Sequence, residues 1–354
     1  MKLTRSQIMV LIVLGVLTLG IYGCLVGTVV INSRQISQAI LPKATTTPPP
    51  TAVADEPTTA PTATTIPSPT PTPTPAAPQT RYDLQVTSDP NNPAPRLQRG
   101  YVYIKLNAYA RAVEDFDTAI ELDATLTDAY VGRGEAYFYL KEWSAALSDF
   151  EQALAQSPDR ADVHAWRGYV LSLQGQHRQA IEALRQAVAL DGANSENHLT
   201  LADALLHNRN YEEARLEYTT VLSLEIRSVG AYVGRAMAWA EEGNLDAAEA
   251  DLSSAQGIAP HDPVVLNGRA RFYAWYRHGN LDEAKQLAQR AVDKAEDDLE
   301  RATYLGTLGW IYYQQGQYDE SVSTLEEATA LATVEGQVIY SEIQEHLEEA
   351  KKAQ

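Results

Sequence analysis

The sequence predicts an all-α protein, a solenoid of antiparallel helix pairs preceded by one transmembrane helix and a disordered linker. Three observations predict the solenoid. Similar text recurs with a period of about 34 residues, apolar positions within each repeat follow a spacing of three and four, and a short polar turn divides each repeat. Spacings of three and four indicate helices, and a fixed period of this length indicates units that bury their apolar faces against their neighbours.

Residues 1–34 are predicted to be a transmembrane anchor with a short N-terminal tail. No charged residue lies between Arg5 and Arg34, and residues 8–31 are almost wholly apolar. A helix of that length rises 1.5 Å per residue and can cross a hydrocarbon core of about 30 Å. A cleaved signal sequence and a lipoprotein modified at Cys24 are the alternatives.

Residues 35–92 are predicted to be a disordered linker rich in proline and threonine, as in "PSPTPTPTPAAP". Such a composition has no apolar periodicity and cannot bury a core. Threonine-proline tracts are typical of stalks outside the cytoplasm. Together with the basic residues before the apolar run, the tract predicts a single-pass membrane protein with an extracytoplasmic repeat body.

The repeat frame is clearest between residues 127 and 160. Eight positions mark it: Gly134, Tyr137, Leu140, Trp143, Ala146, Phe150, Ala153 and Pro158. Similar residues recur at the same positions of the other units, and the sixth unit has two extra residues in its turn. The predicted units are residues 93–126, 127–160, 161–194, 195–228, 229–262, 263–301 and 302–335, and a capping helix follows at 336–354.

These eight recurring positions resemble the tetratricopeptide repeat, or TPR, over about two-thirds of the chain. The resemblance implies a right-handed superhelix with a concave groove lined by the first helix of each unit. Binding of protein or peptide partners in that groove is the function that it implies.

Arginine recurs directly before the small framework residue in five units. Three of these arginines, Arg99, Arg133 and Arg235, are followed at one constant spacing by an aspartate on the partner helix. An anion-binding ladder is one interpretation. Ion pairs between the two helices of each unit are the simpler one, and we predict Arg99–Asp115, Arg133–Asp149 and Arg235–Asp251.

Composition argues against several other functions. The net charge is -18. Four basic and two acidic residues precede residue 81, so the remainder carries -20, unlike a surface for nucleic acid. One cysteine excludes a disulfide framework, and no histidine pair or glycine-rich loop suggests a metal or phosphate site. We therefore predict no enzyme, no cofactor and no small-molecule substrate.

The groove is predicted from the residue after each small framework position and from those three and four positions further on. Aromatic side chains there are good anchors for a peptide or a helix. The candidate partner-binding residues are Tyr101, Lys105, Phe138, Tyr139, Tyr169, Leu206, Arg271, Trp275, Trp310 and Tyr313.

The sequence thus predicts a membrane-tethered scaffold that binds partners in its groove, with the membrane contacted through residues 8–31. One alternative is an assembly factor for a membrane or envelope complex that acts through its convex face or its ends. An enzyme with a helical-repeat body is another, although no clustered acid, base or metal site supports it.

Overall fold

The computed structural model describes residues 78–277, 279–332 and 337–354, and these residues form sixteen helices and no strand. The helices are α3 (Pro78–Ser88), α4 (Pro93–Lys105), α5 (Tyr109–Leu122), α6 (Thr127–Tyr139), α7 (Trp143–Gln156), α8 (Ala161–Leu173), α9 (His177–Leu190), α10 (Ser195–His207), α11 (Tyr211–Leu224), α12 (Val229–Glu241), α13 (Leu245–Ile258), α14 (Pro263–Trp275), α15 (Leu281–Val292), α16 (Asp298–Gln314), α17 (Tyr318–Ala332) and α18 (Gln337–Ala353).

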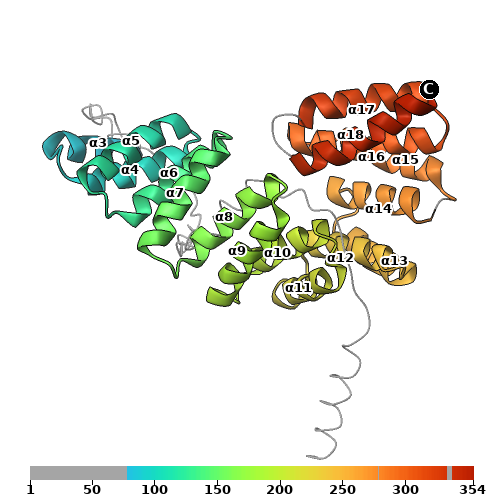
Figure 1. Cartoon of the computed structure of the whole chain (residues 1–354), viewed down its shortest axis with the longest axis horizontal. Coiled ribbons are helices and arrows are strands. Elements are labelled where there is room, and N and C mark those ends of the chain that lie inside the picture. Colours follow the sequence, from blue (N-terminus) through green and yellow to red (C-terminus); the bar gives the residue numbers. More distant parts are fainter. Residues whose placement is uncertain (1–77, 278, 333–336) are drawn as a thin grey trace, which may run out of the picture.

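Seven helix pairs follow one another along an arc, from α4 with α5 to α16 with α17. Figure 1 shows the arc descending from α3 through α9 to α13 and rising again to α17 and α18. First helices of successive units contact each other, for example α4 with α6 and α12 with α14. Within the described residues, successive second helices make no comparable contact. The first helices therefore lie on the inner, concave side of the arc.

The small framework residues allow the two helices of a unit to pack closely. A Cβ atom on Gly134 would lie 2.6 Å from Cε1 of Phe150, and one on Gly100 would lie 2.7 Å from the Phe116 ring. Phe116 and Phe150 are completely buried. Each ring thus fills the space that the glycine on the partner helix leaves open.

The turn between the two helices of a unit requires a left-handed backbone. One residue there has a positive φ in six of the units: Asn107, Lys141, Gly175, Arg209, Gly243 and Gly316. The first five follow one another at the repeat period, so the period that the sequence shows extends to the backbone conformation. L-residues with side chains adopt this conformation at a cost, which glycine avoids.

The linker prediction is wrong for its last part, because residues 78–88 form α3 and not a disordered segment. This helix packs on α4, and Asp83 on it accepts a 2.7 Å hydrogen bond from Arg99. The preceding residues are rich in proline and threonine, so the composition of this region gave no indication of a helix.

The last unit also begins earlier than residue 302, since α16 starts at Asp298 and is 17 residues long. Asp297 caps it by accepting a hydrogen bond from the backbone amide of Glu300. An acceptor at this position satisfies an amide that the helix leaves free, and it stabilises the extra turn.

The predicted membrane location is corrected. Helices α3 to α18 have 11 to 17 residues, whereas a spanning helix needs about 20 apolar residues. Across the three described ranges, no helix has both the length and the apolar character for a membrane crossing. Residues 8–31, on which the prediction of a single-pass protein with an extracytoplasmic body rested, lie outside those ranges, as does most of the linker.

Candidate partner-binding groove

Aromatic side chains line the concave side of the first three units. Tyr101 packs edge-on against Phe116, and its hydroxyl donates a 2.8 Å hydrogen bond to the carbonyl of Asp128. Tyr139 stacks on Tyr109 with ring centroids 4.7 Å apart. These tyrosines are half-buried, so each keeps part of its surface exposed.

Phe138 was predicted in the groove, but it is only 8% exposed. Its ring lies 5.2 Å from that of Trp166 and 5.4 Å from that of Tyr169, both on the first helix of the next unit. Phe138 therefore belongs to the core between α6 and α8, and Tyr169, which packs against it, is half-buried.

Lys105 is exposed at the end of α4, and its positive charge lowers the pKa of the Glu135 carboxyl group on α6. Burial raises the pKa of Glu135 to about 7, and the ammonium group of Lys105 opposes this shift. The first half of the groove thus holds one carboxyl group that changes charge near neutral pH.

Leu206 and Asp203 are on α10, in the middle of the groove. Leu206 is half-buried and packs against the main core. Asp203 is 6% exposed and accepts a hydrogen bond from the hydroxyl of Tyr218 through Oδ1. Its Oδ2 is buried and accepts no hydrogen bond from the described residues. Burial raises the pKa of Asp203 well above its ordinary value, and the carboxylate of Glu196 raises it further.

A row of acidic residues occupies one equivalent position in the first turns of three successive first helices: Asp128, Asp162 and Glu196. Arg160 pairs with the first two, at 2.7 Å from Asp128 and 2.6 Å from Asp162. The residue equivalent to Arg160 in the next unit is Asn194, which has no charge. Glu196 therefore lacks the arginine that its two counterparts share.

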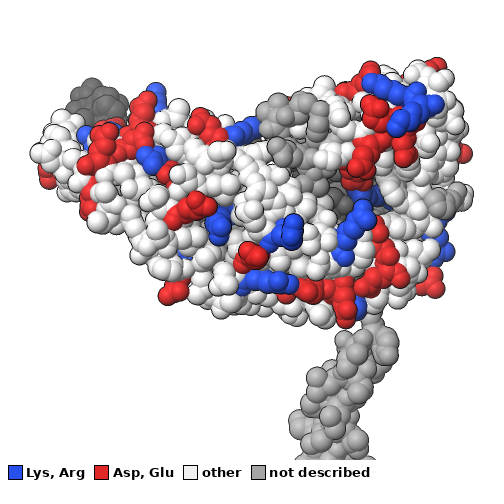
Figure 2. All heavy atoms as spheres, viewed as in Figure 1, with Lys and Arg blue, Asp and Glu red and all other residues white. Residues whose placement is uncertain are grey.

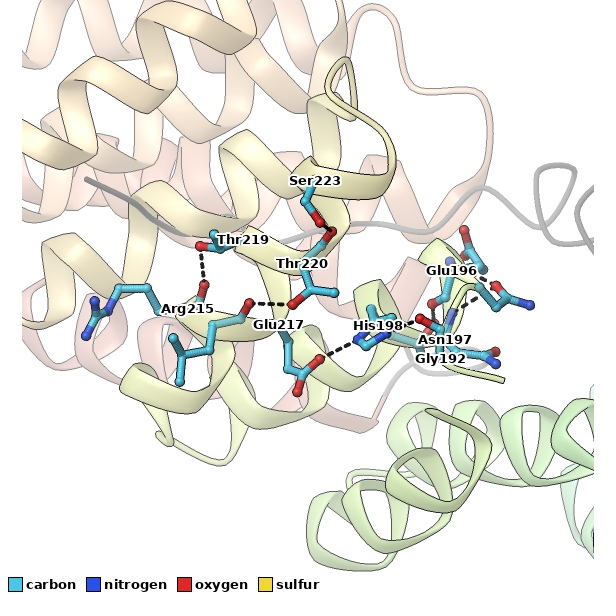
Figure 3. Close-up of polar contacts among 12 residues, drawn as sticks. Gly192, Glu196, Asn197, His198, Arg215, Glu217, Thr219, Thr220 and Ser223 are labelled. Atoms are coloured by element: carbon cyan, nitrogen blue, oxygen red, sulfur yellow. Dashed lines mark hydrogen bonds and ion pairs between the residues drawn. The ribbon is translucent and has the colours of Figure 1, made fainter. Parts of the chain in front are cut away.

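Asn194 instead caps α10, accepting hydrogen bonds from the backbone amides of Glu196 and Asn197. Figure 3 shows His198 reaching from α10 towards Glu217 on α11, away from Glu196. One oxygen of Glu196, Oε1, is buried and accepts no hydrogen bond from the described part of the chain. Burial raises the pKa of Glu196, and Glu225 raises it further.

Three of the four remaining predicted residues contact α18. Arg271 donates a 2.7 Å hydrogen bond to Glu342 and lies over the ring of Trp275. Trp310 stacks on His346, with centroids 4.1 Å apart, and Trp275 lies 5.8 Å from the same imidazole ring. Tyr313 extends this group by stacking on Trp310, with centroids 4.7 Å apart. Helix α18 thus does more than cap the last unit, because it contacts Arg271, Trp275 and Trp310.

The predicted ion pairs within units are confirmed. Arg99, Arg133 and Arg235 each donate two hydrogen bonds, of 2.6 to 3.0 Å, to Asp115, Asp149 and Asp251 respectively. The three aspartates are 3% to 6% exposed. These arginines therefore join the helices of a unit and are not available to bind anions.

Several residues of the groove were not among those predicted from the sequence. Glu342 and His346 were assigned only to a cap, and Glu196 was not considered. Comparison of each polar residue with its counterpart in the neighbouring unit could have identified Glu196, because Asn194 precedes it where Arg160 precedes Asp162. On the face drawn in Figure 2, acidic groups gather near the two ends of the arc and along its lower edge.

Five models of the tetratricopeptide repeat family match the chain, at residues 96–126, 134–175, 171–224, 199–263 and 263–333. A crystal structure of a tetratricopeptide repeat protein from Parabacteroides merdae is similar, with a TM-score of 0.62 and 16% sequence identity. The similarity covers 73% of this chain and 98% of that one, which shows the fold.

Two further similarities are weaker. The crystal structure of YrrB, described as a TPR protein with an unusual peptide-binding site, is 23% identical with a TM-score of 0.48, over 53% of this chain and 97% of that one. Anaphase-promoting complex subunit 3 of Schizosaccharomyces pombe is 23% identical over 167 residues. That match covers 47% of this chain but only 24% of that protein, so the chain spans about a quarter of its length. The family models, which together cover residues 96–126 and 134–333, show that the repeat region belongs to the tetratricopeptide repeat family.

Proposed function

We propose that the chain is a non-enzymatic scaffold that binds a protein or peptide segment on the concave side of its first four units. One observation carries the proposal. Half-buried side chains of successive first helices, Tyr101, Tyr139 and Tyr169, lie along this side without being completely enclosed by the stack.

Tyrosine suits such a role because it offers a large rigid surface with few rotatable bonds. The spacing of the three residues on successive helices favours an extended segment that contacts one unit after another. The fission-yeast relative is named as a subunit of a multiprotein complex, which supports a protein partner more than a small molecule.

The far end of the groove is a less favourable place for a partner. Arg271, Trp275 and Trp310 already contact α18, so a partner there would have to displace this helix. Displacement would also expose Ile343 and Leu347, which are 2% and 6% exposed. We therefore assign partner binding to the first four units.

Capture of partners from a native cell extract tests this function. A variant with Tyr101→Ala and Tyr139→Ala is compared with the unchanged chain by quantitative mass spectrometry. The matched control carries Leu122→Ala, Leu190→Ala and Leu216→Ala, which are 38%, 42% and 58% exposed on second helices.

Loss of specific partners in the tyrosine variant, with retention in the leucine variant, is expected. The opposite result would favour an assembly factor that acts through its convex face. Thermal unfolding of both variants shows whether each remains folded.

A further inference from the structure

In the middle of the groove, Glu196 and Asp203 form no ion pair with any residue that the structure describes. Glu196 and Asp203 are two helical turns apart on α10, so they lie on the same face of the helix. Each has one buried carboxylate oxygen that accepts no hydrogen bond from the described residues. A buried carboxylate without donors is costly, since it has lost water and gained nothing in return.

Tyr169 is on the neighbouring first helix, α8, which packs on α10, and the charges of these two carboxylates act on its phenol. Burial raises its pKa, and the charges of Glu196, Asp203 and Asp297 raise it further. The charged groups that raise the pKa of this phenol are therefore acidic ones, two on α10 and one, Asp297, directly before α16. An aromatic face next to carboxylates is a favourable environment for a cation.

The preceding units show how the same position is neutralised within the chain. Arg160 bridges Asp128 and Asp162, whereas Asn194 occupies its place beside Glu196. Asp128 and Asp162 both pair with Arg160, whereas Glu196 has Asn194 two residues before it and keeps an oxygen that accepts no hydrogen bond from the described residues. A guanidinium or ammonium group supplied from outside would complete the row.

We propose that the middle of the groove binds an arginine or lysine side chain of the partner segment, between Glu196 and Asp203 and against the ring of Tyr169. This inference rests on the proposed function and names the chemistry of its partner, a basic segment. The net charge of -20 over residues 81–354 favours the approach of such a segment. A bound cation also favours the ionised form of Asp203, which burial disfavours.

The test uses the full chain and a fluorescein-labelled peptide of five Arg-Ser repeats, with fluorescence anisotropy at 50 and 150 mM sodium chloride. The same peptide with citrulline in place of arginine is the neutral probe. The site variant is Glu196→Gln with Asp203→Asn, in which residue 203 can still accept the hydrogen bond from Tyr218. The matched control is Glu114→Gln with Glu151→Gln, two exposed carboxylates on second helices. Both variants replace two carboxyl groups by amides.

We expect the site variant to bind the arginine peptide at least about tenfold more weakly, and the control to change affinity less than about twofold. The citrulline peptide should bind no better to the unchanged chain than to the site variant. The thermal unfolding midpoint of the site variant should be equal or higher, because burial disfavours the ionised forms of both carboxyl groups that it replaces. Loss of binding would then not reflect unfolding.

Three outcomes would overturn the inference. The first is no binding of the arginine peptide at 50 mM salt, and the second is equal weakening in both variants, which would show a general charge effect. The third is tighter binding of spermidine than of the peptide with the same dependence on Glu196 and Asp203, which would assign the site to a small polyamine. If the site variant retains the natural partners that the tyrosine variant loses, this inference fails while the proposed function stands.

Discussion

Arg271 on α14 and Glu342 on α18, far apart in sequence, form an ion pair of 2.7 Å on the concave side of the last units. The pair joins the C-terminal helix to a helix two units before it. In a repeat protein each unit mainly contacts its direct neighbours, so this contact adds a longer-range restraint to the end of the solenoid.

Arg271→Ala is expected to lower the free energy of unfolding by about 1–2 kcal/mol, because it removes a hydrogen bond between charged groups and the packing on Trp275. Urea unfolding followed by circular dichroism measures this. Arg277→Ala is the matched control, since its partners Asp246 and Glu249 are 98% and 41% exposed, and it should cost less than about 0.5 kcal/mol. Equal losses of unfolding free energy in the two variants would show that the pair of Arg271 with Glu342 contributes no more than an exposed ion pair.

Gly134→Ala should destabilise the second unit by roughly 1–3 kcal/mol, because the new methyl group would lie 2.6 Å from Cε1 of the Phe150 ring. Gly257→Ala, in the last turns of α13, meets no atom within 4 Å and should stabilise the chain by up to about 1 kcal/mol. Thermal and urea unfolding of the two variants measure the contrast. A change in stability of the same sign for both variants would contradict the packing argument.

Arg209→Gly should stabilise the chain by about 1 kcal/mol, since Arg209 has a φ of 62° in the turn between α10 and α11. The equivalent turn residue one unit later is Gly243, with a φ of 82° and open space around it. Gly243→Ala should therefore destabilise by a similar amount, although nothing obstructs its side chain. The urea midpoints of Arg209→Gly and Gly243→Ala are expected to shift in opposite directions. Shifts in the same direction would show that the positive φ does not determine the stability of these turns.

Glu135 should make stability depend on pH. Its folded pKa is about 7, above the ordinary 4.5, so the folded state holds the proton more tightly. The protonated Glu135 carboxyl contributes fully to the free energy of unfolding below about pH 4.5. This contribution, roughly 1–3 kcal/mol, is lost as pH rises through about 7. Urea unfolding between pH 5 and 8 should show a smaller decline for Glu135→Gln than for the unchanged chain. Glu151→Gln, at an exposed position, should decline as the unchanged chain does.

The repeating features were predictable because one unit can be compared with the next. The ion pair of Arg133 with Asp149 follows from a spacing that recurs in other units, and the structure confirms it. Ser321 occupies the framework position at which the other six units have alanine. In the structure it is completely buried, and its hydroxyl donates a 2.8 Å hydrogen bond to the carbonyl of Gly309, which explains why a polar residue is tolerated.

Features that depend on how units curve and on where the ends fold back were not predictable. Phe138 occupies a position expected to face the groove, but Trp166 of the next unit covers it. The pairing of Arg271 with Glu342 depends on the path of α18 across the concave side, which no period in the sequence gives. Helix α3 lacks a repeat to compare with, and its contact with Arg99 appears only in three dimensions.

Site-specific photo-crosslinking in cells tests the central claim, partner binding on the concave side, most directly. Benzoylphenylalanine replaces Lys105, exposed on the first helix α4, or Leu216, 58% exposed on the second helix α11. Partner proteins covalently joined to the chain through position 105, and not through position 216, are the predicted result. Crosslinks to partners through position 216 alone would contradict the account.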